Sequence, residues 1–208
     1  DSIALQIKKF NRILNFDLNT KEITVESGLN LAELLNFTLK YNLWIPQLPG
    51  YPLISVGGAV ASNAHGKSCA FHGTIRNSIK RISLFHKDNG WLNLSKKENK
   101  EIFDLTIGGL GLTGTIVNIT FELEEIKNKS FTTNKTKVLT ISDCIKKIRE
   151  KSDNKSSFTY SWNRADSLKN LGKGIIFENS LDNNGTEKTQ YIPEKLTNKF
   201  TKLPFSLW

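Results

Sequence analysis

The sequence contains no methionine, two cysteines, five prolines and three histidines in 208 residues. Without a methionine at its start, we expect it to be an internal segment of a longer protein. Cys69 and Cys144 stand far apart and in no metal-binding or redox spacing, which excludes a disulfide framework and favours a reduced compartment. Because the three histidines and two cysteines form no Cys/His cluster, we expect no metal site.

Long apolar runs are also missing. No stretch approaches the length of a membrane span, and no signal peptide is visible. We therefore expect no integral membrane segment and a cytoplasmic location, with peripheral contact to a membrane left open. The formal net charge is +9, but the lysines are scattered among asparagines and form no basic stripe interleaved with aromatic residues. This pattern argues against nucleic-acid binding and predicts a modest preference for anionic partners.

The most informative stretch runs from Trp44 to Lys67. Its three prolines fix backbone dihedrals and remove donors, so an ordinary helix or central strand is excluded there. Gly57-Gly58 permits a close approach of another group, and the small residues 59–64 can start a helix. A helix N-terminus suits a phosphate or an electron-rich ring edge. On composition alone, a Pro/Gly-rich surface loop is an equally good interpretation.

A second glycine cluster, Gly108–Gly114, precedes an alternating β-branched stretch over residues 115–123. Glycines before a strand usually mark a bulge or a tight bend. The alternation itself predicts a strand with one buried face.

These two blocks carry a resemblance. Trp44–Lys67 resembles the second flavin-contacting segment of the FAD-binding oxidoreductases of the vanillyl-alcohol oxidase / p-cresol methylhydroxylase (PCMH) type. Its Leu-Pro-Gly, Val-Gly-Gly-Ala and His-Gly-Lys runs are similar to those of the decaprenylphosphoryl-ribose oxidases within that family. The block from Glu101 to Gly114 matches the same family at the expected distance, and Asp1-Ser2 resembles the end of its pyrophosphate loop.

The fold that we expect is α+β. The resemblance implies a partial PCMH-type FAD-binding domain over residues 1–125, with most of the pyrophosphate-loop subdomain missing. Residues 126–208 are expected to begin an antiparallel α+β substrate domain. Sequence patterns predict strands at 3–7, 23–26, 79–85, 91–94, 115–123, 131–138, 157–162 and 174–179. They also predict a helix from the N-cap Asn30 to about Tyr41, and one over 142–151 capped by Ser142 or Asp143.

The function implied by the resemblance is oxidation of a secondary sugar hydroxyl to a ketone, with FAD accepting the hydride. A polyprenyl-phosphate-linked pentose is one candidate substrate, which would place the enzyme in bacterial cell-wall or polysaccharide biosynthesis. A separate NAD(P)H-dependent reductase is a candidate partner. The alternatives are an aldonolactone or alditol oxidase of the same fold, and a flavin-free binding protein that retains the fold.

The resemblance also suggests site residues. His65 is the candidate catalytic residue, since an imidazole can accept or position a proton near neutral pH, and Lys67 is the candidate for binding an anionic substrate group. A lone histidine or lysine is otherwise an ordinary surface residue. The expected FAD contacts are Asp1, Ser2, Pro49, Gly50, Gly57, Gly58, Ala61, Ser62, Gly66 and Ile116. The chain departs from the family pattern at Ser68-Cys69-Ala70, at Asp104 and at Arg164.

Overall fold

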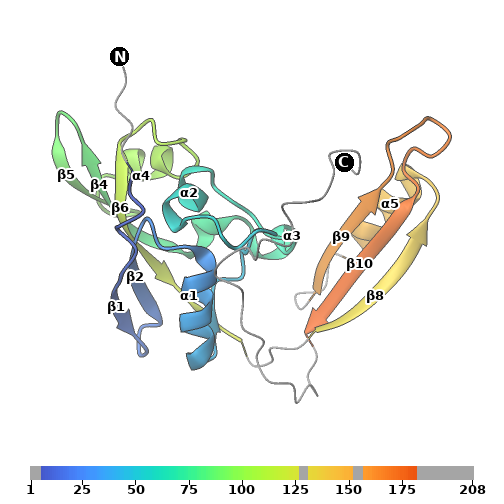
Figure 1. The fold of residues 1–208 in the computed structure, drawn as a ribbon, viewed down its shortest axis with the longest axis horizontal. Coiled ribbons are helices and arrows are strands. Elements are labelled where there is room, and N and C mark those ends of the chain that lie inside the picture. Colours follow the sequence, from blue (N-terminus) through green and yellow to red (C-terminus); the bar gives the residue numbers. More distant parts are fainter. Residues whose placement is uncertain (1–5, 127–130, 152–156, 182–208) are drawn as a thin grey trace.

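The computed structural model describes residues 6–126, 131–151 and 157–181. Its larger part is a five-stranded antiparallel sheet in the order β1-β2-β6-β4-β5, shown with its helices in Figure 1. In that order the strands are β1 (Ile13–Asp17), β2 (Glu22–Glu26), β6 (Thr115–Glu122), β4 (Ile79–His86) and β5 (Gly90–Ser95). The helices beside them are α1 (Leu31–Thr38), η1 (Leu39–Tyr41), α2 (Val56–Ala61), α3 (Cys69–His72), η2 (Ile75–Ser78) and α4 (Lys100–Thr106).

Strand β6 holds this sheet together, because it lies between β2 and β4 although it comes after both in the sequence. Ile119 pairs with Val25 of β2 on one side and with Ile82 of β4 on the other. These three side chains and Phe121 are fully buried in one apolar core that also includes Val56 and Val60 of α2. Burial of each such side chain stabilises the fold by about 1.5–3 kcal/mol. The strand predicted over 115–123 is confirmed as β6, and the strands predicted at 79–85 and 91–94 are confirmed as β4 and β5.

Helix α1 forms where its sequence pattern predicts it. The Asn30 side chain accepts a hydrogen bond from the Glu33 backbone N–H, and the Glu33 carboxylate accepts one from the N–H of Asn30, which completes a capping box. The apolar face of α1 is buried, and the helix tightens into η1 before Asn42 adopts a left-handed conformation. The chain then enters the proline segment.

Three sequence-based expectations were wrong. Within the predicted strand 3–7, the described residues Gln6 and Ile7 form no strand, and β1 lies further along at Ile13–Asp17. The N-cap of α5 is Thr140, whose Oγ1 accepts the Asp143 N–H at 3.1 Å. Residues 68–77, which the sequence predicts to be a polar loop, contain α3 and most of η2.

A second, three-stranded antiparallel sheet has the order β8-β10-β9. It consists of β8 (Phe131–Val138), β9 (Ser157–Asn163) and β10 (Gly174–Leu181), and α5 (Ile141–Lys151) covers one of its faces (Figure 1). Val138, Cys144 and Ile176 pack together between helix and sheet, with Ile148 against them. The strand–helix–strand–strand order expected for this region is confirmed.

The two sheets are linked through a small apolar cluster of Leu35, Trp44 and Ile126, against which Phe158 of β9 packs. The Trp44 and Phe158 rings meet edge to face, with centroids 5.8 Å apart. The remaining two-stranded pair is formed by β3 (Leu43–Trp44) and β7 (Glu124–Glu125). It supplies Trp44 to this cluster, and Ile126 follows β7 directly.

One ion pair anchors the edge of the first sheet. The Glu26 side chain is buried and accepts the Arg12 backbone N–H at 2.7 Å and the Arg12 guanidinium at 2.8 Å. The guanidinium hydrogen bond lowers the pKa of the Glu26 carboxyl below its usual value. A carboxyl with a lowered folded-state pKa contributes stability above its unfolded pKa, about 4.3, and loses it as the pH falls through the folded value.

We therefore expect Arg12→Gln to lower the melting temperature at pH 7, and the difference from the wild type to shrink as the pH falls below about 4. Thermal melts at several pH values measure this. The control is Lys87→Gln, because the Lys87–Asp88 pair is exposed and 4.0 Å apart. A pH-independent difference for Arg12→Gln would contradict the assignment.

Candidate flavin site

Helix α2 begins one residue before the glycine pair, not after it as the sequence suggested. Ser55 is the N-cap, and its Oγ accepts the Gly58 N–H at 3.2 Å. The two glycines therefore occupy the first turn of the helix. The helix is held in place by backbone hydrogen bonds from Val56 to Leu29 and from Gly57 to Ser27, both 2.7 Å long.

The two glycine-containing blocks meet at the other end of α2. The Gly108 N–H donates to the Val60 carbonyl at 3.0 Å, and the Leu110 N–H donates to the Ala61 carbonyl at 2.9 Å. Asn63, in a left-handed conformation, packs against Gly108. Its buried Oδ1 has no hydrogen-bond partner among the described residues, and such an acceptor normally finds a ligand or water. Segments more than 40 residues apart in sequence thus form one continuous surface.

The glycines of the first block fall into two groups. A Cβ on Gly57 would lie 2.8 Å from the Ser27 Cβ, and one on Gly66 would lie 2.5 Å from the Leu48 carbonyl oxygen, so close packing within the chain explains both. Gly58, in contrast, is exposed, and a Cβ there would meet only the Ser55 Oγ, at 3.0 Å. Gly50 is exposed with nothing within 4 Å.

Among the described residues, only the Ser55 hydroxyl would lie close to a side chain at position 58. A glycine in a helix costs roughly 1 kcal/mol relative to alanine. A glycine at this exposed position of α2 therefore fits a flat group that must approach the backbone closely. The exposed Ser62, whose Oγ donates to the Gly58 carbonyl at 2.9 Å, borders the same surface. This cradle, which a Cβ would fill, is suited to the ring system of FAD.

The second block is a loop shaped by three glycines with positive φ, Gly108, Gly111 and Gly114. Sequence reasoning missed the residue that fixes it. Arg76 of η2 donates to the Asp104 carboxylate at 3.0 Å, and to the carbonyls of Asp104 and Ile107 at 2.8 Å each. Lys100 and Arg76 together lower the pKa of Asp104. The departure at Asp104 thus has a structural reason: it supplies the partner of Arg76.

His65 and Lys67 both lie on the exposed surface beyond α2. His65 forms an isolated antiparallel bridge with Thr74, and its Nδ1 makes one long contact, 3.4 Å, with the Gly66 carbonyl. Its ring is therefore free to contact a ligand. The Lys67 ammonium lies 3.8 Å from the centroid of the Tyr160 ring in β9. The next residue, Ser68, is buried and donates to the Pro46 carbonyl at 3.0 Å, which fixes the backbone here.

The other predicted FAD contacts are placed less favourably. Ile116 is 6% exposed, with its side chain in the core of the first sheet. Pro49 and Ala61 are partly buried. The Ala61 carbonyl accepts the Leu110 N–H of the second glycine block. Asp1 and Ser2 lie outside the described residues.

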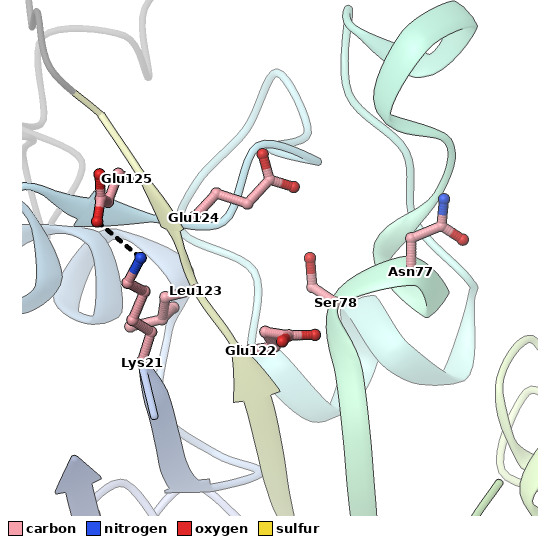
Figure 2. Close-up of a pocket in the computed structure, with 7 residues that line it drawn as sticks. All are labelled: Lys21, Asn77, Ser78, Glu122, Leu123, Glu124 and Glu125. Carbon is pink, nitrogen blue, oxygen red and sulfur yellow. Dashed lines mark hydrogen bonds and ion pairs between the residues drawn. The ribbon is translucent and has the colours of Figure 1, made fainter. Parts of the chain in front are cut away.

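A pocket of about 430 Å³ lies elsewhere, between η2 and the end of β6 (Figure 2). None of the predicted site residues lines it. Its wall carries three carboxylates, Glu122, Glu124 and Glu125, and the last pairs with Lys21 at 2.6 Å. Because this acidic wall repels anions, the pocket does not suit the pyrophosphate of a dinucleotide.

The described ranges contain neither a membrane-spanning helix nor a metal-binding group of side chains. No helix in these ranges is long and apolar enough to cross a membrane. Within the same residues, no group of three or more His, Cys, Asp or Glu side chains could hold a metal ion.

Comparison with known proteins bears on this site. Residues 1–95 match the FAD binding domain family. The decaprenylphosphoryl-beta-D-ribose oxidase of Mycolicibacterium smegmatis is 27% identical over 196 residues, which is 93% of this chain and 42% of that protein. The L-gulonolactone oxidase of Mus musculus is 28% identical over 122 residues, 59% of this chain and 28% of that protein. This chain thus spans less than half the length of these relatives.

A solved structure supports the fold independently. The Physcomitrella patens BBE-like 1 protein superimposes with a TM-score of 0.65 at 15% identity, over 85% of this chain and 38% of that one. At this identity the likeness concerns the fold alone. Together with the FAD binding domain match, it confirms the α+β PCMH-type fold, present here in part, and FAD as the cofactor. The chain therefore carries a match to the FAD binding domain family over residues 1–95 and is similar to FAD-binding oxidoreductases of this type, decaprenylphosphoryl-beta-D-ribose oxidase among them.

Proposed function

We propose that the complete protein oxidises a secondary sugar hydroxyl to a ketone while reducing FAD. The observation that carries this proposal is the exposed surface formed by Gly58, Ser62, His65 and the Gly108–Gly114 loop. It combines a backbone cradle for a flat ring with a titratable side chain at its edge. The similarity to the decaprenylphosphoryl-beta-D-ribose oxidase supports the proposal because it extends across both sheets.

Different residues of the chain would bind FAD, transfer the proton and bind the substrate. FAD, when bound, accepts a hydride from the carbon that bears the hydroxyl. We assign its binding to the backbone of Pro49, Gly50, Gly58 and the other predicted contacts. His65 would accept or orient the hydroxyl proton, since its ring has no strong hydrogen bond to any residue that the structure describes. Lys67 would bind an anionic group of the substrate.

The second sheet would supply the opposite wall. Successive strand residues point to opposite faces, so Phe158, Tyr160 and Trp162 of β9 lie on the face away from α5. Tyr160 stacks on Phe177 of β10, with centroids 5.0 Å apart, and Trp162 is 70% exposed. An aromatic face of this kind suits a sugar ring or an apolar chain. We accordingly propose a FAD domain over 1–125 and the start of a substrate domain over 126–208.

A second candidate function is oxidation of an aldonolactone or alditol. The similarity to the mouse L-gulonolactone oxidase favours it, but that similarity covers 59% of this chain, compared with 93% for the first relative. A polyprenyl-phosphate-linked pentose remains the substrate that we favour. With such a substrate, we also propose that a separate NAD(P)H-dependent reductase acts as partner and that the protein contacts the membrane surface.

The test is anaerobic mixing of the full-length FAD-loaded protein with a polyprenyl-phosphate-linked pentose, an aldonolactone and an alditol. We expect the pentose to bleach the flavin absorbance and to yield a ketone two mass units lighter. Bleaching by the lactone or alditol alone would establish the second candidate. No bleaching by any hydroxyl compound would contradict both.

A further inference from the structure

The contact between Lys67 and Tyr160 joins the two sheets at the edge of the candidate site. Lys67 follows the His65-Gly66 segment of the first part of the chain, and Tyr160 lies in the middle of β9. The ammonium nitrogen is 3.8 Å from the ring centroid, which is within the range of a cation–π interaction. Tyr160 is itself held in place by its stacking on Phe177.

The charge of Lys67 is not neutralised by this contact. Within the described ranges Lys67 forms no ion pair, whereas Lys21, Lys80 and Lys100 each pair with a carboxylate. An aromatic ring attracts a cation through its quadrupole and carries no opposite charge. An ammonium placed on a ring therefore keeps its full charge and can bind an anion on its other side.

The side chains beside Tyr160 on the second sheet are also aromatic or positively charged. Lys135 of β8 and Phe177 of β10 are in register with Tyr160 across the sheet, so the three side chains share a face. The Lys135 ammonium lies 5.8 Å from the Phe177 ring centroid. Two ammonium groups therefore lie on the aromatic rings of this row, Lys135 on Phe177 and Lys67 on Tyr160. The row itself contains no carboxylate.

We propose that Tyr160 is the positioning residue of Lys67: its ring holds the ammonium at the junction of the two sheets, directed to receive a phosphate group of a bound ligand. This inference rests on the proposed role of Lys67 in substrate binding and adds a residue that acts through it. Tyr160 does not itself touch the reacting atoms. Its substitution should therefore weaken anion binding and leave the flavin in place.

The first experiment detects the contact directly. Lysines of the full-length protein are converted to ¹³C-dimethyl-lysine, which keeps the positive charge, and the Lys67 signal is identified by its loss in Lys67→Met. Methyl groups above the face of an aromatic ring resonate upfield. We expect an upfield Lys67 signal in the wild type and in Tyr160→Phe, and its return to the exposed-lysine position in Tyr160→Leu. Trp91→Leu, which removes an exposed aromatic ring of β5 that contacts Phe85, is the control and should leave the signal shifted. A wild-type signal at the exposed position would overturn the proposal.

The second experiment tests the positioning role, with inorganic phosphate as the probe. Phosphate should move the Lys67 signal in the wild type, and Tyr160→Leu should weaken its apparent affinity about 2- to 5-fold, with Tyr160→Phe close to the wild type. Equal affinity in Tyr160→Leu, or a Lys67 signal that does not respond in the wild type, would refute it. The FAD content of the same samples is read separately, so a failure of the proposed oxidoreductase function would be recognised independently.

Discussion

His65→Ala should slow the reduction of the flavin by substrate about 10²- to 10⁴-fold, the usual contribution of a well-placed acid–base group. Its FAD content and stability should change little. The ring is exposed, and its one hydrogen-bond contact among the described residues is the 3.4 Å approach of Nδ1 to the Gly66 carbonyl. Anaerobic stopped-flow measurement of flavin bleaching, normalised to bound FAD, gives the comparison.

The other two histidines serve as controls for His65. His86 accepts the N–H groups of Asp88 and Asn89 in the β4–β5 turn, and His72 faces Glu124 at 3.8 Å. Both side chains thus have partners outside the Gly58 helix and the Gly108–Gly114 loop, so alanine at either position should leave the reduction rate near that of the wild type. A near wild-type rate in His65→Ala, or an equal loss in His72→Ala, would show the assignment to be wrong.

Gly58→Val should remove FAD from the protein without unfolding it. Among the described residues a Cβ at position 58 meets only the Ser55 Oγ, at 3.0 Å, and valine is a slightly better helix former than glycine. This gain offsets a small shift of the Ser55 cap, so the melting temperature of the apoprotein should stay close to that of the wild type. If the flavin lies against this backbone, a collision of about 1–3 kcal/mol weakens FAD binding roughly 5- to 150-fold. Flavin absorbance of the purified protein and titration with FAD measure the effect.

Gly57→Val is the matched variant one residue earlier. Its side chain would collide with the Cβ and carbonyl of Ser27 in the buried core, so it should lower the melting temperature of the apoprotein as well. The two valine variants thus separate a ligand contact from internal packing. Normal FAD affinity in Gly58→Val would refute the placement of the flavin.

Much of the fold follows from local patterns. The Asn30 cap with its leucine spacing specified α1, and the alternation over 115–123 specified β6. Local patterns predicted less well where strand pairing or a side-chain cap determines the structure. Residues 3–7 look β-prone, but the strand at the edge of the sheet forms at Ile13–Asp17, where it pairs with β2. Cap preference alone favoured Ser142 or Asp143, although the Thr140 side chain is the one that reaches the free N–H of Asp143.

The site was only partly visible in the sequence. The two glycine blocks carry a resemblance, and their assembly through the Gly108–Val60 and Leu110–Ala61 hydrogen bonds is a long-range feature that no local pattern encodes. The same holds for Arg76 and for the Lys67–Tyr160 contact, since each joins segments distant in sequence. The sequence also does not distinguish Gly58 from Gly57. Only the neighbours in space reveal that one is packed internally and the other faces outward.

We propose that the exposed surface around Gly58 binds FAD noncovalently as part of an oxidoreductase. The most direct measurement is the absorbance spectrum of the purified full-length protein, before and after denaturation and filtration. We predict a yellow protein that releases its FAD into the filtrate when unfolded and takes it up again on refolding. A colourless protein that binds no added FAD, or a flavin that stays attached to the unfolded chain, would contradict the claim.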